Sequence, residues 1–289
     1  MENLKVAYVD FWPEFIPYEN IFRPILSNYF SVIIDEKNPD IVIHSIFNGQ
    51  RDIGRYKNVK KIMFLGENYR PSQFDSDYSI SFDIHSGTNY HLPLWQYFLL
   101  LNPQLNERIF TNKPYDILKY DRFCSFVVSN GNSFIRNGFY NQLSQYKHVN
   151  SYGRYLTNSY ELQTLFKETY WRDAKYELFN EITHKFSICF ENNVHPGYCT
   201  EKLMDGFLGG GIPIYYGDPK INKDFNKEAF INATTLGLGQ ALELIKELDN
   251  DDQKYLMIKK QHIFTPEQRE KHLDNLGQFE NWLINIINN

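Results

Sequence analysis

The sequence predicts an α/β protein built from two domains, and three observations support this. The chain has 289 residues, more than one average hydrophobic core holds, which favours two domains. Short apolar runs alternate with loops and helical stretches along most of its length. Many of these runs are apolar at successive positions, as in parallel strands that helices cover on both faces. We therefore expect a first domain over residues 1–120 and a second over residues 121–289.

The first half contains five runs that are expected to form strands. They are KVAYVDF (5–11), YFSVIID (29–35), DIVIHSIF (40–47), KKIMFLGE (60–67) and YSISFDI (78–84). The segment LPLWQYFLLL (92–101) is expected to form a helix that closes this half. The segment NKPYDILKYDR (112–122), which contains a proline among polar residues, is expected to connect the two domains.

The second half repeats the alternation of strands and helices. The expected strands are CSFVVSN (124–130), HVNSYG (148–153), KFSICFE (185–191), IPIYYG (212–217) and FNKEAFINA (225–233). The expected helices cover residues 133–145, 172–181 and 200–208, and most of 236–288, where apolar residues recur at spacings of three and four. The last of these helices could pack back onto the first domain.

Composition excludes some functions and favours one compartment. The net charge of −5 is spread without a basic block, so we expect no nucleic-acid partner. The odd number of cysteines, three, and their lack of metal-ligand spacing favour a reducing compartment. We find no transmembrane run and no leader pattern. We expect a cytoplasmic protein, and leave open a peripheral position at the inner face of the membrane.

A segment rich in polar residues and glycine, residues 190–219, joins two expected strands. In a parallel sheet the loops at the carboxyl ends of the strands face the ligand, which places Glu191 to Lys202 at the site. Thr200 is expected to cap the next helix, and the triple glycine from Gly209 to end it. A lysine in the first turn of a helix is unfavourable unless an anion lies nearby, so Lys202 indicates a phosphate site. The alternative is an ordinary solvated Glu201–Lys202 pair.

A second cation strengthens the phosphate interpretation. Arg136 follows the strand CSFVVSN and the turn-like Ser129–Asn132, and so repeats the strand, loop and helix geometry in the same domain. An arginine fork and a lysine point charge from neighbouring loops suit a diphosphate. The pair therefore indicates a nucleotide ligand.

The motifs resemble those of the α-1,3/4-fucosyltransferases of glycosyltransferase family 10, particularly the bacterial members. The resemblance lies in FENN, GY-x-TEK and IPIYYG-x-P, with FVVSN-x-N-x-x-RN-x-FY, SYGRYLTN and LGEN-x-x-P in support. It is strong over about residues 122–226. It implies an α/β fold of the GT-B type, with two Rossmann-like domains facing a central cleft. It also implies GDP-fucose as the donor and transfer with inversion.

The same resemblance assigns the donor-binding residues. Those on family donor positions are Arg136, Arg154, Asn192, Tyr198, Glu201 and Lys202. Arg136 and Lys202 fall on diphosphate positions, Glu201 on the acid near the ribose or the sugar, and Arg154 on a basic position whose role stays open. Since these cations can stabilise the departing diphosphate, we expect no metal site and no obligatory cofactor.

Glu67, in KKIMFLGEN, is the candidate general base, both from its place at the end of a strand and from the resemblance. Its burial would raise its pKa toward the working range. The alternative is that Glu67 only caps the loop or supports Arg70. In the catalytic interpretation, Glu67 takes the proton of the acceptor hydroxyl while the cations hold the leaving GDP.

The expected reaction is transfer of L-fucose to O3, or O4, of an N-acetylglucosamine unit in a Gal-GlcNAc-type oligosaccharide or polysaccharide. Two alternatives remain within the fold: a non-catalytic nucleotide-sugar or glycan-binding protein, and a transferase of a different nucleotide-activated sugar. A third is a retaining glycosidase that uses Glu191 and Glu201, whose carboxyl groups would have to lie about 5 Å apart.

Overall fold

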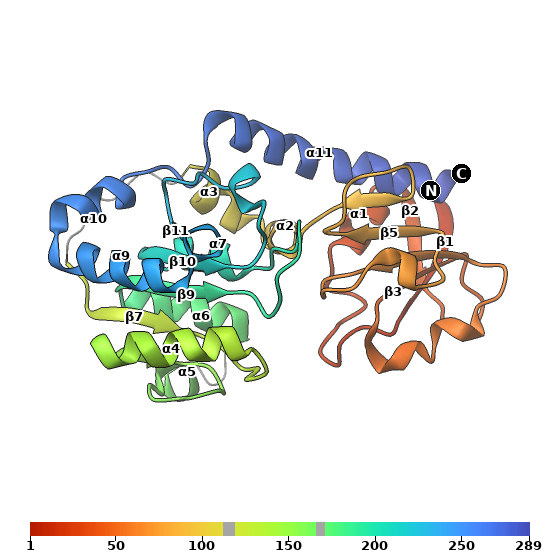
Figure 1. Cartoon of the computed structure of the whole chain (residues 1–289). Coiled ribbons are helices and arrows are strands. Elements are labelled where there is room, and N and C mark those ends of the chain that lie inside the picture. The colour runs from red at the N-terminus through yellow and green to blue at the C-terminus, as the bar shows by residue number, and fades with distance from the viewer. Residues whose placement is uncertain (112–118, 166–170) are drawn as a thin grey trace. The chain divides into compact units, whose positions relative to one another are not determined.

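The computed structural model of the chain describes residues 1–111, 119–165 and 171–289 (Figure 1). It divides into two compact units. Unit 1 comprises Met1–Pro103 and Lys271–Asn289, and unit 2 comprises Gln104–Glu270. Most of the segment expected to connect the domains, residues 112–118, lies outside the described residues.

The unit division differs from the expected boundary after residue 120. Helix α3 (Gln104–Phe110) belongs to unit 2, where it packs on α7 (Lys202–Leu208). Phe110 stacks on Phe264 at a centroid distance of 5.2 Å. These contacts join residues about 100 to 150 positions apart, so periodicity along the sequence could not indicate them.

Unit 1 is built on a parallel sheet of six strands in the order β2-β1-β3-β4-β5-β6. The strands are β1 (Glu2–Val9), β2 (Phe30–Ile34), β3 (Ile41–His44), β4 (Lys60–Phe64), β5 (Tyr78–Ser81) and β6 (Asn89–His91). The five runs expected in this half all form strands. The sixth, β6, has three residues and is too short to show an alternation in the sequence.

Successive side chains of β1 enter opposite faces of the unit 1 sheet, as the strand geometry requires. Val6 and Tyr8 pack with α1 (Phe22–Ser27) and α11 (Pro266–Asn288). Ala7 and Val9 join a smaller cluster with the 3₁₀ helix η2 (Ile53–Arg55). The remaining helical elements are η1 (Phe47–Gln50), η3 (Pro71–Gln73) and α2 (Leu94–Leu101).

Helix α11 carries the end of the chain onto the unit 1 core. Its Phe279 and Leu283 have no exposed surface, and Lys60 Nζ donates to the carbonyl of Ile286 at 2.7 Å. A lysine at this position satisfies carbonyls that the last turn of a helix leaves without an amide donor. Residues 271–289 are thus part of the unit that begins with Met1.

Unit 2 is built on a parallel sheet of five strands in the order β11-β10-β9-β7-β8. The strands are β7 (Arg122–Phe126), β8 (Val149–Ser151), β9 (His184–Phe190), β10 (Ile212–Tyr216) and β11 (Ile231–Asn232). Besides α3 and α7, its helices are α4 (Phe134–Tyr146), α5 (Glu161–Thr164), α6 (Trp171–Glu181), α8 (Ala233–Leu236), α9 (Leu238–Asn250) and α10 (Asp252–Lys259), with the 3₁₀ helix η4 (Ile221–Lys223).

The strands of unit 2 are covered on both faces, which confirms the expected parallel and buried sheet. On one face Phe186 and Phe190 of β9 pack with side chains of α4 and α9. On the other face Cys189 lies against α7, where a Cβ built on Gly206 would come within 2.4 Å of the cysteine sulfur. Gly206 therefore allows α7 to approach the sheet closely.

Candidate functional site

The strand order of unit 2 defines one position for a ligand. β8 lies on one side of β7 and β9 on the other, so the order of the chain reverses between β7 and β9. Ligands of open parallel sheets bind outside the carboxyl ends of the strands at this switch point. Helix α4 follows β7 and the loop of residues 191–201 follows β9. These two segments hold most of the residues that the sequence assigned to the donor.

Arg136 lies in the first turn of α4 and is 1% exposed. Its Nη1 donates to Asn192 Oδ1 at 2.6 Å and to the carbonyl of Phe190 at 3.4 Å, and its Nη2 donates to the carbonyl of Asn130. Within the described residues its Nε, also buried, finds no hydrogen-bond partner. Burial lowers the pKa of the guanidinium, and the Glu191 carboxylate partly offsets that effect. The fork therefore binds protein acceptors here and does not face solvent.

The second cation, Lys202, lies against a buried carboxylate. Its Nζ is 3.2 Å from Glu191 Oε2, 2.8 Å from Thr200 Oγ1 and 3.6 Å from Glu201 Oε1. Burial lowers the pKa of Lys202, but the carboxylates of Glu191 and Glu201 outweigh burial and leave this pKa raised. The ammonium therefore stays charged at neutral pH, and its side chain keeps 19% of its surface exposed.

Glu191 directly follows β9, and its side chain has no exposed surface. Its two oxygens accept from the backbone amide and the hydroxyl of Thr200, both at 2.7 Å. A Cβ built on Gly217 would lie 2.6 Å from Glu191 Cγ, so the absence of a side chain there makes room for this carboxylate. Burial raises the pKa of Glu191, and Lys202 opposes the rise.

Thr200 does not cap α7, which corrects the expectation from the sequence. The N-cap of α7 is Glu201, whose side chain makes no capping bond, and the helix has seven residues. The hydroxyl of Thr200 donates to Glu191 instead, because that carboxylate is buried and needs donors. The expected end of the helix is confirmed: α7 ends at Leu208, with Gly210 at a φ of 75°.

The structure brings five of the six predicted donor residues into this part of unit 2. They are Arg136, Asn192, Tyr198, Glu201 and Lys202, of which Tyr198 is 2% exposed. Arg154 lies exposed in the loop that follows β8. Its role stays a prediction.

Glu67 lies in unit 1, three residues beyond β4, and is exposed there. The expectation that Glu67 is buried is therefore wrong within unit 1. The neighbouring Arg70 forms an ion pair with Asp83 and lies over the ring of Phe82 at 4.2 Å. The proposed part of Glu67 in catalysis is not tested by these contacts.

Sequence reasoning assigned no supporting role to Glu191 or to the carbonyl of Asn130. An acid that directly follows an apolar strand at a switch point has to be paired if it is buried, and this could have indicated Glu191. The carbonyl contact of Arg136 gave no signal of its own, because any residue type supplies a carbonyl.

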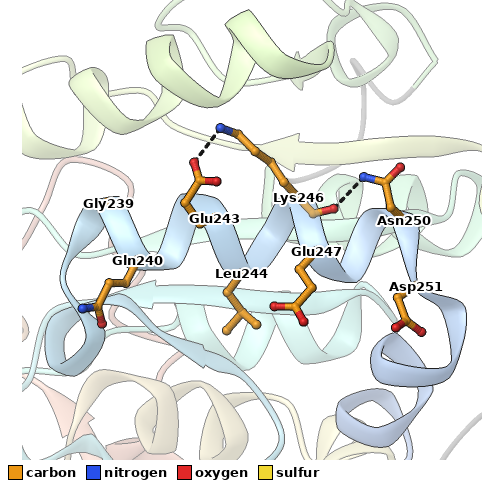
Figure 2. Close-up of a pocket in the computed structure, with 8 residues that line it drawn as sticks. All are labelled: Gly239, Gln240, Glu243, Leu244, Lys246, Glu247, Asn250 and Asp251. Atoms are coloured by element: carbon orange, nitrogen blue, oxygen red, sulfur yellow. Dashed lines mark hydrogen bonds and ion pairs between the residues drawn. The ribbon is translucent and has the colours of Figure 1, made fainter.

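A surface hollow lies elsewhere on unit 2, along α9 (Figure 2). Residues between Gly239 and Asp251 line it, and none of them is a predicted donor residue. Its charged side chains form ion pairs, Lys246 with Glu243 at 2.7 Å, and Glu247 and Asp251 with Lys254 of α10. This hollow is not the candidate site.

Among the residues that the structure describes, no group of three or more His, Cys, Asp and Glu could hold a metal ion. The expectation that no metal is required stays a prediction. In the same described ranges, no helix is both long and apolar enough to cross a membrane.

Two α/β units, each built on a parallel sheet, define a fold of the GT-B type. The family model described as glycosyltransferase family 10 (fucosyltransferase) C-term matches residues 118–272. A second model, the N-terminal domain of alpha-(1,3)-fucosyltransferase FucT, matches residues 6–100. The chain belongs to glycosyltransferase family 10.

Curated relatives agree with this assignment. Alpha-(1,3)-fucosyltransferase FucT of Helicobacter pylori is 28% identical over 88% of this chain, and the match covers 59% of that protein. A putative fucosyltransferase of Acanthamoeba polyphaga mimivirus is 33% identical over 57% of this chain and 27% of its own length. The chain thus spans less than two thirds of these relatives.

Solved structures show the same fold along nearly the whole chain. A crystal structure of an alpha1,3-fucosyltransferase superposes with a TM-score of 0.74 at 26% identity, covering 97% of this chain and 90% of that one. The structure of an alpha1,3-fucosyltransferase with GDP-fucose gives a TM-score of 0.71 at 25% identity, with coverages of 97% and 91%.

Proposed function

We propose that the protein transfers L-fucose from GDP-fucose to a hydroxyl of a glycan acceptor, with inversion at the anomeric carbon. The observation that carries the proposal is the placement of Arg136 and Lys202 around the switch point of the unit that the family model covers. The relative whose structure contains GDP-fucose supports the choice of donor. The acceptor we propose is O3, or O4, of N-acetylglucosamine in a Gal-GlcNAc-type glycan.

The chemistry asks for cations at the leaving group. Negative charge grows on the diphosphate as the glycosidic bond breaks. A positive charge that is held in place beforehand therefore stabilises the transition state more strongly than it stabilises the bound donor. The raised pKa of Lys202 keeps its ammonium available for this. Arg136 would take up phosphate oxygens in exchange for Asn192 Oδ1 or the carbonyl of Asn130, its acceptors in this structure.

Glu67 is the proposed general base. It lies three residues beyond β4 at an exposed position, which supports a place for its carboxylate beside the acceptor hydroxyl. A base has to come within hydrogen-bond reach of the proton that it takes. Glu67→Gln keeps the size of the side chain and removes the basic oxygen, so transfer should stop while GDP-fucose still binds.

One side chain argues against the glycosidase alternative. A retaining glycosidase needs a carboxylate that can attack the sugar. The side chain of Glu191 has no exposed surface and accepts from Thr200 and Lys202, so in this arrangement it cannot act as that nucleophile.

The test combines calorimetric titration with product analysis. Wild type, Lys202→Ala and the surface control Lys246→Ala are titrated with GDP-fucose and with a uridine and an adenosine nucleotide sugar. N-acetyllactosamine is then added and the product is analysed by mass spectrometry and NMR. We expect guanosine-selective binding that is lost only in Lys202→Ala, together with a fucosylated product.

Each other outcome points elsewhere. If the wild-type protein does not bind GDP-fucose, the proposed assignment of the donor is wrong. Binding without transfer to any glycan in an acceptor panel would favour the non-catalytic binding protein. Preference for another nucleotide sugar would favour a transferase of that sugar.

A further inference from the structure

We propose that Glu191 is a positioning residue for the donor diphosphate: its buried carboxylate holds the turn of residues 200–202 and fixes where the Lys202 ammonium lies. This inference rests on the proposed function. It adds a residue for which neither the motif nor the chemistry above supplied a role.

The Glu191 carboxylate forms its hydrogen bonds to that turn. Oε1 accepts from the Thr200 amide, and Oε2 accepts from both the Thr200 hydroxyl and the Lys202 ammonium. The Thr200 hydroxyl also lies 2.8 Å from Lys202 Nζ, so these three side chains form a closed triangle. One carboxylate thus sets both the backbone of the turn and the end of the lysine side chain.

The surroundings of Glu191 restrict its movement. Its backbone amide donates to the carbonyl of Tyr216 at 2.8 Å, which ties the residue to β10. Gly217 leaves the space that Glu191 Cγ occupies. A side chain without exposed surface cannot change rotamer without displacing its neighbours. The carboxylate is therefore a fixed point, and the lysine, which keeps some exposed surface, is placed relative to it.

Burial of this charge needs a reason. Removing a carboxylate from water costs several kcal/mol, and an ion pair often only offsets that cost, so apolar residues of similar volume would stabilise the fold at least as well. What the carboxylate supplies beyond stability is a defined place for the ammonium. A preorganised cation loses less entropy when the diphosphate binds and holds its geometry as charge develops.

A structural anchor and a positioning residue differ in which ligands they affect. Loss of a structural anchor would weaken the binding of every ligand of the site. Loss of a positioning residue that acts through Lys202 would weaken the binding only of ligands that carry a diphosphate. GDP and guanosine share the nucleoside and differ in the diphosphate, so they form the matched pair of probes.

The first variant is Glu191→Gln, which keeps the shape of the side chain. Its amide oxygen can still accept from the Thr200 amide, but it offers the ammonium no charge. We expect GDP to bind about tenfold more weakly by calorimetry, the loss expected for one hydrogen bond to a charged group. Guanosine binding, followed by ligand-observed NMR, should be unchanged. GDP binding as tight as in wild type, or equal weakening of both ligands, would overturn the inference.

A double-mutant cycle tests whether Glu191 acts through Lys202. Lys202→Met removes the cation, and the double variant Glu191→Gln/Lys202→Met should bind GDP within about twofold of Lys202→Met alone. Independent residues would instead give additive losses, which would contradict the proposal. The control is Glu161→Gln. Glu161 pairs with Arg122 at the first residue of β7, at the opposite end of the strands, and the change should leave GDP and guanosine binding unaltered.

Thr200→Val provides a second route if Glu191→Gln does not fold. It removes the hydroxyl that contacts both charged groups and leaves the ion pair in place. We expect GDP to bind about threefold to tenfold more weakly, with guanosine binding unchanged. Unchanged GDP binding would overturn the inference. If the wild-type protein binds guanosine but not GDP, both the proposed donor and this inference are wrong. If the wild type binds GDP and only the expected effects of the variants are absent, this inference is wrong and the proposed function stands.

Discussion

Arg136, two residues beyond the start of unit 2's helix α4, donates from Nη1 to Oδ1 of Asn192 at 2.6 Å, two residues beyond β9. The bond links the segments that follow the adjacent strands β7 and β9, at the point where the order of the sheet reverses. A single amide oxygen therefore helps to set the position of the most deeply buried cation of the site.

Asn192→Ala should weaken GDP binding about fivefold to tenfold, because Arg136 loses its shortest side-chain acceptor and its orientation becomes less defined. The free energy of unfolding should fall by about 1–3 kcal/mol, the cost of leaving a buried donor without its partner. Calorimetry and urea unfolding measure the two effects. The control Asn250→Ala, at the exposed end of α9, should change neither.

Lys175→Met should lower the free energy of unfolding by about 3–5 kcal/mol in urea, because it removes a buried cation from the buried Asp205 carboxylate. Lys175 and Asp205 form an ion pair between α6 and α7 and are 5% and 2% exposed, and Tyr176 donates to the same carboxylate at 3.1 Å. Lys246→Met breaks an exposed pair with Glu243 on α9 and should cost less than about 1 kcal/mol. Equal costs for the two substitutions would contradict the burial argument.

The free energy of unfolding should fall as the pH drops from about 6.5 toward 4, because His184 is buried in its neutral form. Burial, with a smaller effect of Arg122, lowers the pKa of His184 from 6.5 to about 4. In this window the unfolded chain binds a proton that the folded chain does not, so folding loses about 1.4 kcal/mol per pH unit, or about 3 kcal/mol in total.

Urea unfolding between pH 4 and 7 measures this loss in wild type and in His184→Gln, which can retain a contact with the Tyr152 hydroxyl. The free energy of unfolding of the variant should fall by about 3 kcal/mol less than that of wild type over this pH range. The control His148→Gln, at an exposed position, should keep the wild-type slope. Parallel profiles for wild type and His184→Gln would contradict the assignment.

Gly153→Ala should destabilise unit 2 by about 1–3 kcal/mol or more, because the added methyl has no room. A Cβ at this position would lie 2.0 Å from the carbonyl oxygen of Val128, and backbone cannot move aside as a flexible side chain can. Gly239→Ala is the matched control, because a Cβ there meets nothing within 4 Å. Thermal unfolding of the two variants measures the difference, and a stable Gly153→Ala would show that the segments following β7 and β8 can separate.

The sequence predicted elements best where periodicity or apolar runs were long. Strands β1, β9 and β10 and helices α4, α9 and α11 follow from runs of five or more residues with the spacing of their type. The three-residue β6 and the six-residue α1 gave no such pattern and were missed. Of the run FNKEAFINA, only Ile231–Asn232 forms a strand, because just two of its residues pair with β10.

By itself, the sequence determined the class of fold and indicated Arg136 and Lys202, because strand periodicity, loop position and residue chemistry are all local. The resemblance of its motifs gave the family and the other candidate donor residues. Only the tertiary structure decided the rest: that Thr200 donates to Glu191 rather than capping α7, that Arg136 binds protein acceptors, and that residues 271–289 complete unit 1. The first two depend on which partners the buried polar groups find, and the third depends on the apolar packing of α11 against the unit 1 core. Those partners and that packing are decided only when segments distant in sequence lie side by side.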